Sequence, residues 1–225
     1  FGKIQAPAIG LIALSSAVEA LRMANRVTKQ DVYEWSLASL DGNPVAASNG
    51  LTLSPTIPVD KMGPANIVFV CGGVNVEQAV TSELLSALRR LAQRHVSLGS
   101  LCTGGYALAK AGLLDKYKAV IHWENMSALQ EEFPRVIFSD QLFAIDRDRF
   151  TCTGGIAPLD LMLNIIKDHL GRDIAPMISE QFILDRIRND QDRQHIPLQA
   201  RVGLFHENLI EAAALMEANI EEPLS

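Results

Sequence analysis

Two short stretches of the chain have the residues of buried strands. Ile67–Cys71 is apolar at every position and leads into Gly72 and Gly73, and Val96–Leu101 leads into Cys102–Gly105. A continuous apolar run suits a strand of a parallel sheet, because such a strand is covered on both faces. The sequence therefore predicts two central strands that each end in a glycine-containing turn.

Apolar residues with a helical period alternate with these and other strand-like segments. The expected helices are Ala13–Ala24, Glu83–His95, a helix that ends at Ala111, Trp123–Glu132, Pro158–Leu170 and Ser179–Arg188. The other expected strands are Gly2–Ala6, Val32–Leu40, Leu51–Leu53, Val136–Phe138 and Leu142–Ile145. Alternating strands and helices predict an α/β fold with a doubly wound, mostly parallel sheet sandwiched by helices.

A polar segment separates this pattern from one more helical pattern. We expect Asn189–Pro197 to form a surface loop or linker, and Glu207–Ile220 to form a separate helix that is rich in acidic residues. Ser225 would make a good N-cap for a further helix. The predicted organisation is a main domain over residues 1–189, a linker over 190–206 and the start of a second domain over 207–225.

The net charge of −6 over 225 residues bears on the class of function. A nucleic-acid-binding domain usually carries a basic stripe that neutralises phosphates, so these residues alone are not expected to bind DNA well. No apolar run approaches the roughly 18 residues that a membrane span needs, and no signal-peptide pattern opens the chain. We therefore expect a cytoplasmic protein without a membrane segment.

The three cysteines, Cys71, Cys102 and Cys152, lie far apart and form no Cys-x-x-Cys pair. This spacing argues against a disulfide framework and a cysteine zinc site, so no metal or other cofactor is expected. Cys71 lies inside an apolar strand and should belong to the core. Cys152 begins a second Cys-Thr-Gly-Gly string, whose glycines are expected to serve packing and turning before the helix at Pro158.

Cys102 follows a predicted strand and precedes a predicted helix, as the nucleophile of an elbow does. The backbone amides of Thr103 and Gly73 would then be placed to bind an oxyanion. A position before a helix N-terminus would also lower the pKa of the thiol. The alternative is that the glycines pack a strand against a helix and that Cys102 is a small buried hydrophobe.

His122 precedes Trp123 at an expected strand-to-helix junction, where the imidazole can meet Cys102. A Cys–His pair is the minimum for thiol catalysis. The alternative is a hydrogen-bonded structural histidine. Glu124 and Asp140 are candidates for orienting the imidazole because they lie close to it along the chain, and Trp123 is an aromatic that can line a small-molecule pocket beside it.

Several segments match the pattern of one known fold family. They are Ser16–Asn25, Val70–Gly73, Leu101–Gly105, Ala111–Asp115 and Ile121–Trp123. On these segments the chain resembles the flavodoxin-like class I glutamine amidotransferase (ThiJ/PfpI) fold. Four further segments are similar to the version found at the N-terminus of AraC/XylS-family transcription regulators. They are Thr153–Gly155, Asp160–Leu161, Asp192–Leu198 and Leu215–Ser225, the last of which resembles the first helix of an AraC-type DNA-binding domain.

The resemblance implies an effector-sensing and dimerisation domain of a DNA-binding regulator of amine or amino-acid catabolism. Its partners would be a small-molecule effector, a second copy of the chain, and DNA contacted through a C-terminal domain that begins at residue 207 and is cut off here. The ligand-binding residues that it implies are Gly73, Cys102, Thr103, His122 and Trp123.

Two other classes compete with the sensor: a plain dimerisation scaffold, and a cysteine-dependent enzyme of the PfpI type that uses Cys102 and His122. Hydrolytic relatives carry an acid in the first helix beside the elbow cysteine, and Ala13 takes that place here. An enzyme of this fold also has no use for the acidic helix near the C-terminal end. We therefore expect a sensor in which Cys102 and His122 are vestigial and not catalytic.

Overall fold

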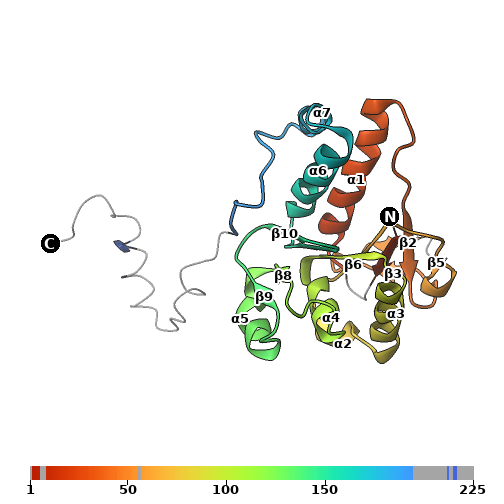
Figure 1. Cartoon of the computed structure of the whole chain (residues 1–225), viewed down its shortest axis with the longest axis vertical. Coiled ribbons are helices and arrows are strands. Elements are labelled where there is room, and N and C mark those ends of the chain that lie inside the picture. The colour runs from red at the N-terminus through yellow and green to blue at the C-terminus, as the bar shows by residue number, and fades with distance from the viewer. Residues whose placement is uncertain (1, 6–8, 55–56, 195–211, 213–214, 217–225) are drawn as a thin grey trace. The chain divides into compact units, whose positions relative to one another are not determined.

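The computed structural model describes residues 2–5, 9–54, 57–194, 212 and 215–216 (Figure 1). The chain divides into two compact units, Phe1–Arg193 and Gln194–Ser225, and the fold and candidate site below belong to the first. The predicted C-terminal helix and second-domain segment lie almost wholly outside the described residues, as does much of the predicted linker.

A seven-stranded sheet forms the centre of the first unit, in the order β10-β11-β7-β6-β1-β2-β5. The strands are β1 Gly2–Gln5, β2 Ser36–Ser39, β5 Ile57–Pro58, β6 Ile67–Cys71, β7 Ser97–Leu101, β10 Phe143–Asp146 and β11 Arg149–Cys152. Neighbouring strands are parallel except β10 and β11, which are antiparallel. Cys71 pairs with Leu101, so the turns after β6 and β7 meet at one edge of the sheet.

Two smaller strand pairs lie outside the main sheet. β3 (Val45–Ala46) and β4 (Thr52–Leu53) are antiparallel, whereas β8 (Lys118–Ala119) and β9 (Ile137–Phe138) are parallel. The predicted strands at Leu51–Leu53 and Val136–Phe138 thus exist, but neither joins the main sheet.

Helices cover both faces of the sheet, which confirms the predicted doubly wound sandwich. Figure 1 shows α1 (Leu11–Thr28), α6 (Ala157–Leu170) and α7 (Ile174–Gln181) on one face. The other face carries α2 (Val76–Ala79), α3 (Ser82–Gln93), α4 (Gly105–Lys110) and α5 (Trp123–Glu132). Short 3-10 helices cover Val59–Lys61 and Cys102–Gly104. No helix in the described part of the chain is both long and apolar enough for a membrane span.

Local sequence explains where several helices begin. The Thr81 side chain accepts a hydrogen bond from the Leu84 amide at 3.3 Å, which caps α3 at its N-terminus. Pro158 lies in the first turn of α6, where its missing N–H would have had no helical partner.

The core lies on both sides of β6. Phe69 and Cys71 pack into the cluster under α1 and α6, whereas Val68 and Val70 pack into the cluster under α3 and α4. Full burial of a side chain such as Phe69 contributes about 1.5–3 kcal/mol. The structure therefore confirms both the buried central strand and the core position of Cys71.

The predicted helix over Ser179–Arg188 is wrong. α7 ends at Gln181, and Ile183 has a left-handed backbone with φ of 54°. Farther on, the Arg188 amide donates to the carboxylate of Asp160 at 2.8 Å instead of a carbonyl one turn earlier. Contacts with α6 thus replace the helical hydrogen bonds that the apolar spacing had predicted.

Candidate functional site

Cys102 occupies a sharp turn between β7 and the helical segment that leads into α4. Its backbone is left-handed, with φ of 57°, which is a strained conformation for a residue with a side chain. Glycines make room for this turn: a Cβ atom on Gly104 would overlap the carbonyl oxygen of Val70, and one on Gly72 would overlap the amide nitrogen of Gly104. The turn after β7 is therefore packed backbone to backbone against the end of β6.

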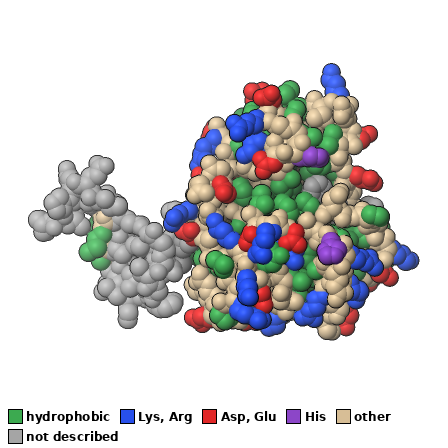
Figure 2. Space-filling view, viewed as in Figure 1, with side chains coloured by type: hydrophobic (Ala, Val, Ile, Leu, Met, Phe, Trp, Pro, Cys, Tyr) green, Lys and Arg blue, Asp and Glu red, His purple; other side chains and the backbone are tan. Residues whose placement is uncertain are grey.

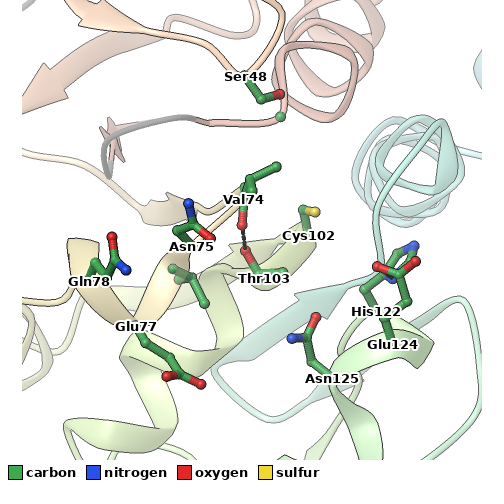
Figure 3. Close-up of a pocket in the computed structure, with 13 residues that line it drawn as sticks. Ser48, Val74, Asn75, Glu77, Gln78, Cys102, Thr103, His122, Glu124 and Asn125 are labelled. Atoms are coloured by element: carbon green, nitrogen blue, oxygen red, sulfur yellow. Dashed lines mark hydrogen bonds and ion pairs between the residues drawn. The ribbon is translucent and has the colours of Figure 1, made fainter.

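Thr103 fastens this turn to the neighbouring strand end. Its hydroxyl donates a hydrogen bond to the carbonyl oxygen of Gly73 at 2.7 Å, drawn as a dashed line in Figure 3. The amide of Cys102 donates to the carbonyl oxygen of Thr153 at 3.3 Å on the other side. The thiol is thus presented from a position fixed by both adjacent strand ends.

Cys102 and His122 come together on either side of Gly154. A Cβ atom on Gly154 would lie 3.2 Å from Cys102 Sγ and 3.2 Å from His122 Cδ2. The distance from the imidazole to the thiol is therefore at most about the sum of these two contacts, and a side chain on Gly154 would press against both groups. Figure 3 shows both side chains at the same cavity, with His122 at the start of α5.

The environment of Cys102 does not favour a thiolate. Burial raises the pKa of the thiol above its ordinary value of 9.0, and this outweighs the lowering effect of hydrogen bonds from Thr103. A Cβ atom on Gly10 would lie 3.7 Å from the carbonyl oxygen of Gly72 and 4.0 Å from both Cys102 Sγ and the methyl group of Ala13, so α1 begins close to the sulfur. The expectation of a lowered pKa is wrong, because desolvation exceeds the effect of one short helical turn.

The two acids considered for orienting His122 behave differently. Glu124 places a carboxylate oxygen 3.6 Å from Nδ1 of His122, but its side chain is 63% exposed. Asp140 instead forms an ion pair with Arg193, with 3.0 Å between Oδ2 and Nη1. Only Glu124 accompanies the imidazole, and it does so at a distance too long for a hydrogen bond.

A cavity of about 490 Å³ opens above these residues (Figure 3). It is lined by Gly10, Ser48, Gly73, Val74, Asn75, Val76, Glu77, Gln78, Cys102, Thr103, His122, Glu124 and Asn125. The predicted residues Gly73, Cys102, Thr103 and His122 are among them. The lining includes two carboxylates, and none of its residues is lysine or arginine, so the cavity presents negative charge to an occupant.

Trp123 is not among the residues that line this cavity. Its ring lies 5.6 Å from the imidazole of His122, centroid to centroid, and is tilted by 34°. The two residues are neighbours at the start of α5. The expected direct contact of Trp123 with a ligand stays a prediction, and its ring packs against His122.

The sequence did not single out the polar residues that follow β6. Asn75 has a left-handed backbone with φ of 57°, and Glu77 and Gln78 belong to the short helix α2. Asparagine adopts this conformation more readily than most residues, and ligands of open α/β sheets bind beyond the carboxyl ends of strands. The place of Asn75 in the turn after a central strand could therefore have indicated from the sequence that it lines a ligand cavity.

Other candidate groups have structural surroundings. Cys152 is buried, and its thiol contacts the carbonyl oxygen of Leu142 at 3.7 Å, which agrees with the expected packing role. Within the described ranges, no three His, Cys, Asp or Glu side chains cluster closely enough to hold a metal ion.

The chain matches the DJ-1/PfpI family over residues 11–168, a range that contains both the elbow cysteine and His122. This match covers more than half of the chain. The chain belongs to the DJ-1/PfpI family.

Two relatives that match nearly the whole chain are transcription regulators of Pseudomonas aeruginosa. The chain is 49% identical to the HTH-type transcriptional regulator GbdR over 214 residues, which is 95% of this chain and 58% of GbdR. It is 40% identical to the HTH-type transcriptional regulator CdhR over 219 residues, which is 97% of this chain and 65% of CdhR. The chain thus spans about three fifths of the length of these relatives.

A solved structure supports the same grouping. The crystal structure of an AraC family transcriptional regulator from Pseudomonas putida superposes with a TM-score of 0.74 and 27% identity. The superposition covers 80% of this chain and 97% of that one. That regulator and this chain therefore share one fold.

Proposed function

We propose that this chain is the effector-sensing part of a DNA-binding transcription regulator of amine or amino-acid catabolism. The observation that carries the proposal is the 49% identity to GbdR across 95% of the chain. The acidic balance of the chain fits this role, because a sensing domain has no phosphates to neutralise. DNA contact belongs to residues beyond the family domain, in the part of the regulator relatives that this chain does not span.

The cavity favours a cationic effector. Glu77 and Glu124 lie on opposite walls, on α2 and α5, so an ammonium group between them is attracted by both. Each carboxylate is exposed, and two opposite charges about 4 Å apart attract by about 1 kcal/mol in water. An anionic compound would meet repulsion of the same size, so the charge of the lining selects amines, and amino acids with a net positive charge, over simple carboxylic acids.

A cysteine hydrolase is the second candidate, because Cys102 and His122 meet at Gly154. Two observations weigh against it. The pKa of the thiol is raised by burial, and the methyl group of Ala13 stands where a supporting carboxylate is expected. A thiol that is protonated near neutral pH and lacks a base-orienting group is a weak nucleophile.

The regulator would act in the cytoplasm as a homodimer, since two-fold regulators match paired half-sites on DNA. Sedimentation of the chain at micromolar concentrations tests this part of the proposal, and a monomer throughout that range would contradict it.

A thermal-shift screen tests the sensing role. Small amines and amino acids are compared with carboxylic acids of matched size; a ligand at about 100 times its Kd adds about 2.7 kcal/mol of stability. We expect stabilisation by members of the amine set alone. Gly154→Leu is the negative control. Its side chain would fill the space between Cys102 and His122, so the amine should no longer raise the melting temperature. Stabilisation by anions but not by amines would contradict the assignment.

A further inference from the structure

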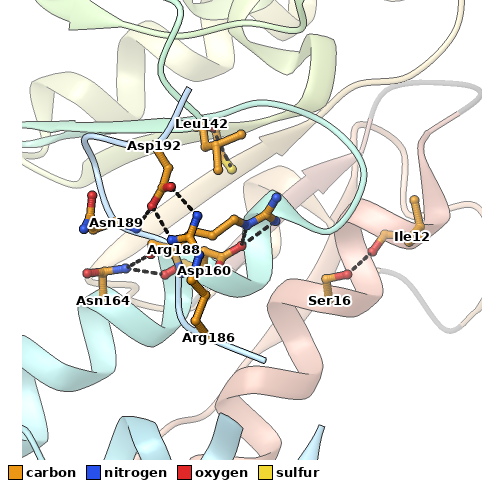
Figure 4. Close-up of polar contacts among 10 residues, drawn as sticks. Ile12, Ser16, Leu142, Asp160, Asn164, Arg186, Arg188, Asn189 and Asp192 are labelled. Carbon is orange, nitrogen blue, oxygen red and sulfur yellow. Dashed lines mark hydrogen bonds and ion pairs between the residues drawn. The ribbon is translucent and has the colours of Figure 1, made fainter. Parts of the chain in front are cut away.

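The segment after α7 is held to α6 by an ion pair whose carboxylate is buried. The carboxylate of Asp160, on the first turn of α6, is buried. It accepts hydrogen bonds from Arg188 through the backbone amide at 2.8 Å, Nε at 2.9 Å and Nη2 at 2.6 Å (Figure 4). The amide group of Asn164, one turn farther along α6, donates to the carbonyl oxygen of Arg188 at 3.0 Å. Both backbone groups and the side chain of Arg188 are therefore held by α6.

A second set of contacts fixes the residues that follow. The carboxylate of Asp192 accepts two hydrogen bonds from Arg186, at 2.9 and 2.6 Å, and one from the amide of Asn189 at 2.7 Å. Figure 4 shows Asp192 beside Leu142, whose amide donates to the carbonyl oxygen of Asp192 at 3.0 Å. Gln141 and Arg193 extend this contact as an antiparallel bridge. The segment is thus attached to the edge of the sheet just before Gln194, where the second unit begins.

An unbroken series of backbone hydrogen bonds joins this attachment to the cavity. The amide of Cys102 donates to Thr153 at 3.3 Å, the amide of Thr153 donates to Leu142 at 3.0 Å, and the amide of Leu142 donates to Asp192. We call these four residues the coupling strip. Gly154, which separates the thiol from the imidazole of His122, follows Thr153 directly.

Three of the four segments that resemble the regulator branch have residues in this one place. Thr153–Gly155 lies directly behind the cavity residues Cys102 and His122, Asp160–Leu161 supplies the clamp, and Asp192 is the far end of the coupling strip. The contacts that join these segments form one region between the cavity and residues 189–193.

We propose that the coupling strip transmits occupancy of the cavity to the segment that leads into the second unit, with Asp160 and Arg188 as its fixed end. This inference rests on the proposed sensing function and adds the route of its regulation. An occupant that displaces Cys102, which lines the cavity, pulls on Thr153, whose amide and carbonyl are both engaged. The displacement either shifts Leu142 and Asp192 together or breaks a bond between them. Because Arg188 is held by α6, the change is confined to residues 189–193.

The test uses the full chain and iodoacetamide as the probe that fills the cavity beside Gly154. The sulfur of Cys102 displaces iodide from the reagent, an S–C bond replaces the C–I bond, and the thiol proton passes to the buffer. Cys71 and Cys152 are buried and should stay unmodified, which mass spectrometry verifies. The Cys102→Ala variant, treated with the same reagent, is the matched control.

Amide hydrogen exchange is then measured with and without the label. We expect the exchange rates at Leu142 and Asp192 to change by about fivefold or more in the labelled chain, since each reports a bond of the strip or its attachment. The amide of Lys116, which donates to Arg135 at 2.7 Å outside the strip, should not change. Unchanged exchange at Leu142 in fully labelled protein would overturn the proposal.

Two clamp variants test the fixed end. Asp160→Asn should raise the amide exchange rates of Arg188 and Asn189 without label, while the alkylation rate of Cys102 stays the same. Arg188→Gln should raise the same two exchange rates. It is less disruptive to folding, because the Arg188 side chain is 29% exposed whereas that of Asp160 is 4% exposed. Native-like exchange at Arg188 and Asn189 in Arg188→Gln would overturn the clamp. The two proposals can be told apart. If exchange at Leu142 changes in the labelled chain but no amine stabilises the protein, the coupling is supported and the sensing of amines is contradicted.

Discussion

Glu124 holds a carboxylate oxygen 3.6 Å from Nδ1 of His122, close enough for attraction to a protonated imidazole but too far for a hydrogen bond. In a hydrolytic triad the third residue fixes the tautomer and direction of the histidine through a short hydrogen bond. A carboxylate that is 63% exposed and screened by water does not perform that task. The pair is better placed to meet a ligand at the rim of the cavity than to activate Cys102.

The raised pKa of Cys102 gives a prediction for its chemistry. Because burial holds the pKa above 9.0, alkylation by iodoacetamide should be slow near neutral pH and should still be rising above about pH 9. The rate of label incorporation, followed by mass spectrometry across the pH range, measures this. A plateau already reached near pH 7 would show a thiolate and would revive the enzyme assignment.

The charge of the cavity predicts which substitutions weaken an amine ligand. Removing one carboxylate, by Glu77→Gln or Glu124→Gln, should raise the Kd of the best amine from the screen by about fivefold, since each charge contributes about 1 kcal/mol. Isothermal titration calorimetry measures the change. Glu131→Gln is the control, because Glu131 lies on α5 with Glu124 but does not line the cavity. Equal effects of all three substitutions would mean that general surface charge, and not the cavity, attracts the ligand.

The close packing of the elbow predicts a cost for one methyl group. Gly104→Ala should destabilise the protein by about 1–3 kcal/mol, because the added carbon overlaps the carbonyl oxygen of Val70, a backbone atom that cannot turn aside. Urea unfolding measures the loss. Gly63→Ala, where nothing lies within 4 Å of the new carbon, should be close to neutral. If Gly104→Ala matched this control, the turn after β7 would be looser than described.

The attachment of the outgoing segment depends on pH through Asp192. Hydrogen bonds from Arg186 and from the amide of Asn189 lower the pKa of this carboxylate from 3.8 to about 2. A depressed acid stabilises the folded form above its unfolded value, so this contribution is complete above about pH 4 and is lost as the pH falls toward 2. The amide signal of Asn189, followed by NMR, should titrate with a midpoint near the lower value. In Arg186→Gln the midpoint should move up toward 3.8, and a wild-type midpoint already at 3.8 would disprove the contact.

Local sequence patterns predicted the elements whose neighbours along the chain decide their structure. The run Ile67–Cys71 is a central strand, and Trp123–Glu132 is a helix with the bounds that its spacing indicated. The helix expected at Ser179–Arg188 does not continue to Arg188, because the Arg188 amide donates to the carboxylate of Asp160, 28 residues away, and not to a carbonyl within a helix. A single-segment pattern contains no information about such a partner.

The candidate site was predictable in part for the same reason. Glycines beside Cys102 and the junction at His122 are local signals, and the structure brings both residues to one cavity. Glu77 and Asn125 look like ordinary surface residues in the sequence, since only the packing of α2 opposite α5 makes them face the same space. The raised pKa of Cys102 likewise depends on its burial in the folded chain, which the residues next to it in the sequence do not reveal.

The measurement that tests the central claim most directly is effector-dependent transcription by the full-length protein carrying Cys102→Ala. The reporter is driven by a promoter that the wild-type protein occupies, and the same preparations are assayed for hydrolytic turnover. A sensing pocket predicts that the variant still responds to the amine, with a shifted concentration dependence, and that neither protein turns over substrate. Loss of the response together with loss of a wild-type turnover on the order of 1 per second would contradict the account, because Cys102 would then be a catalytic nucleophile.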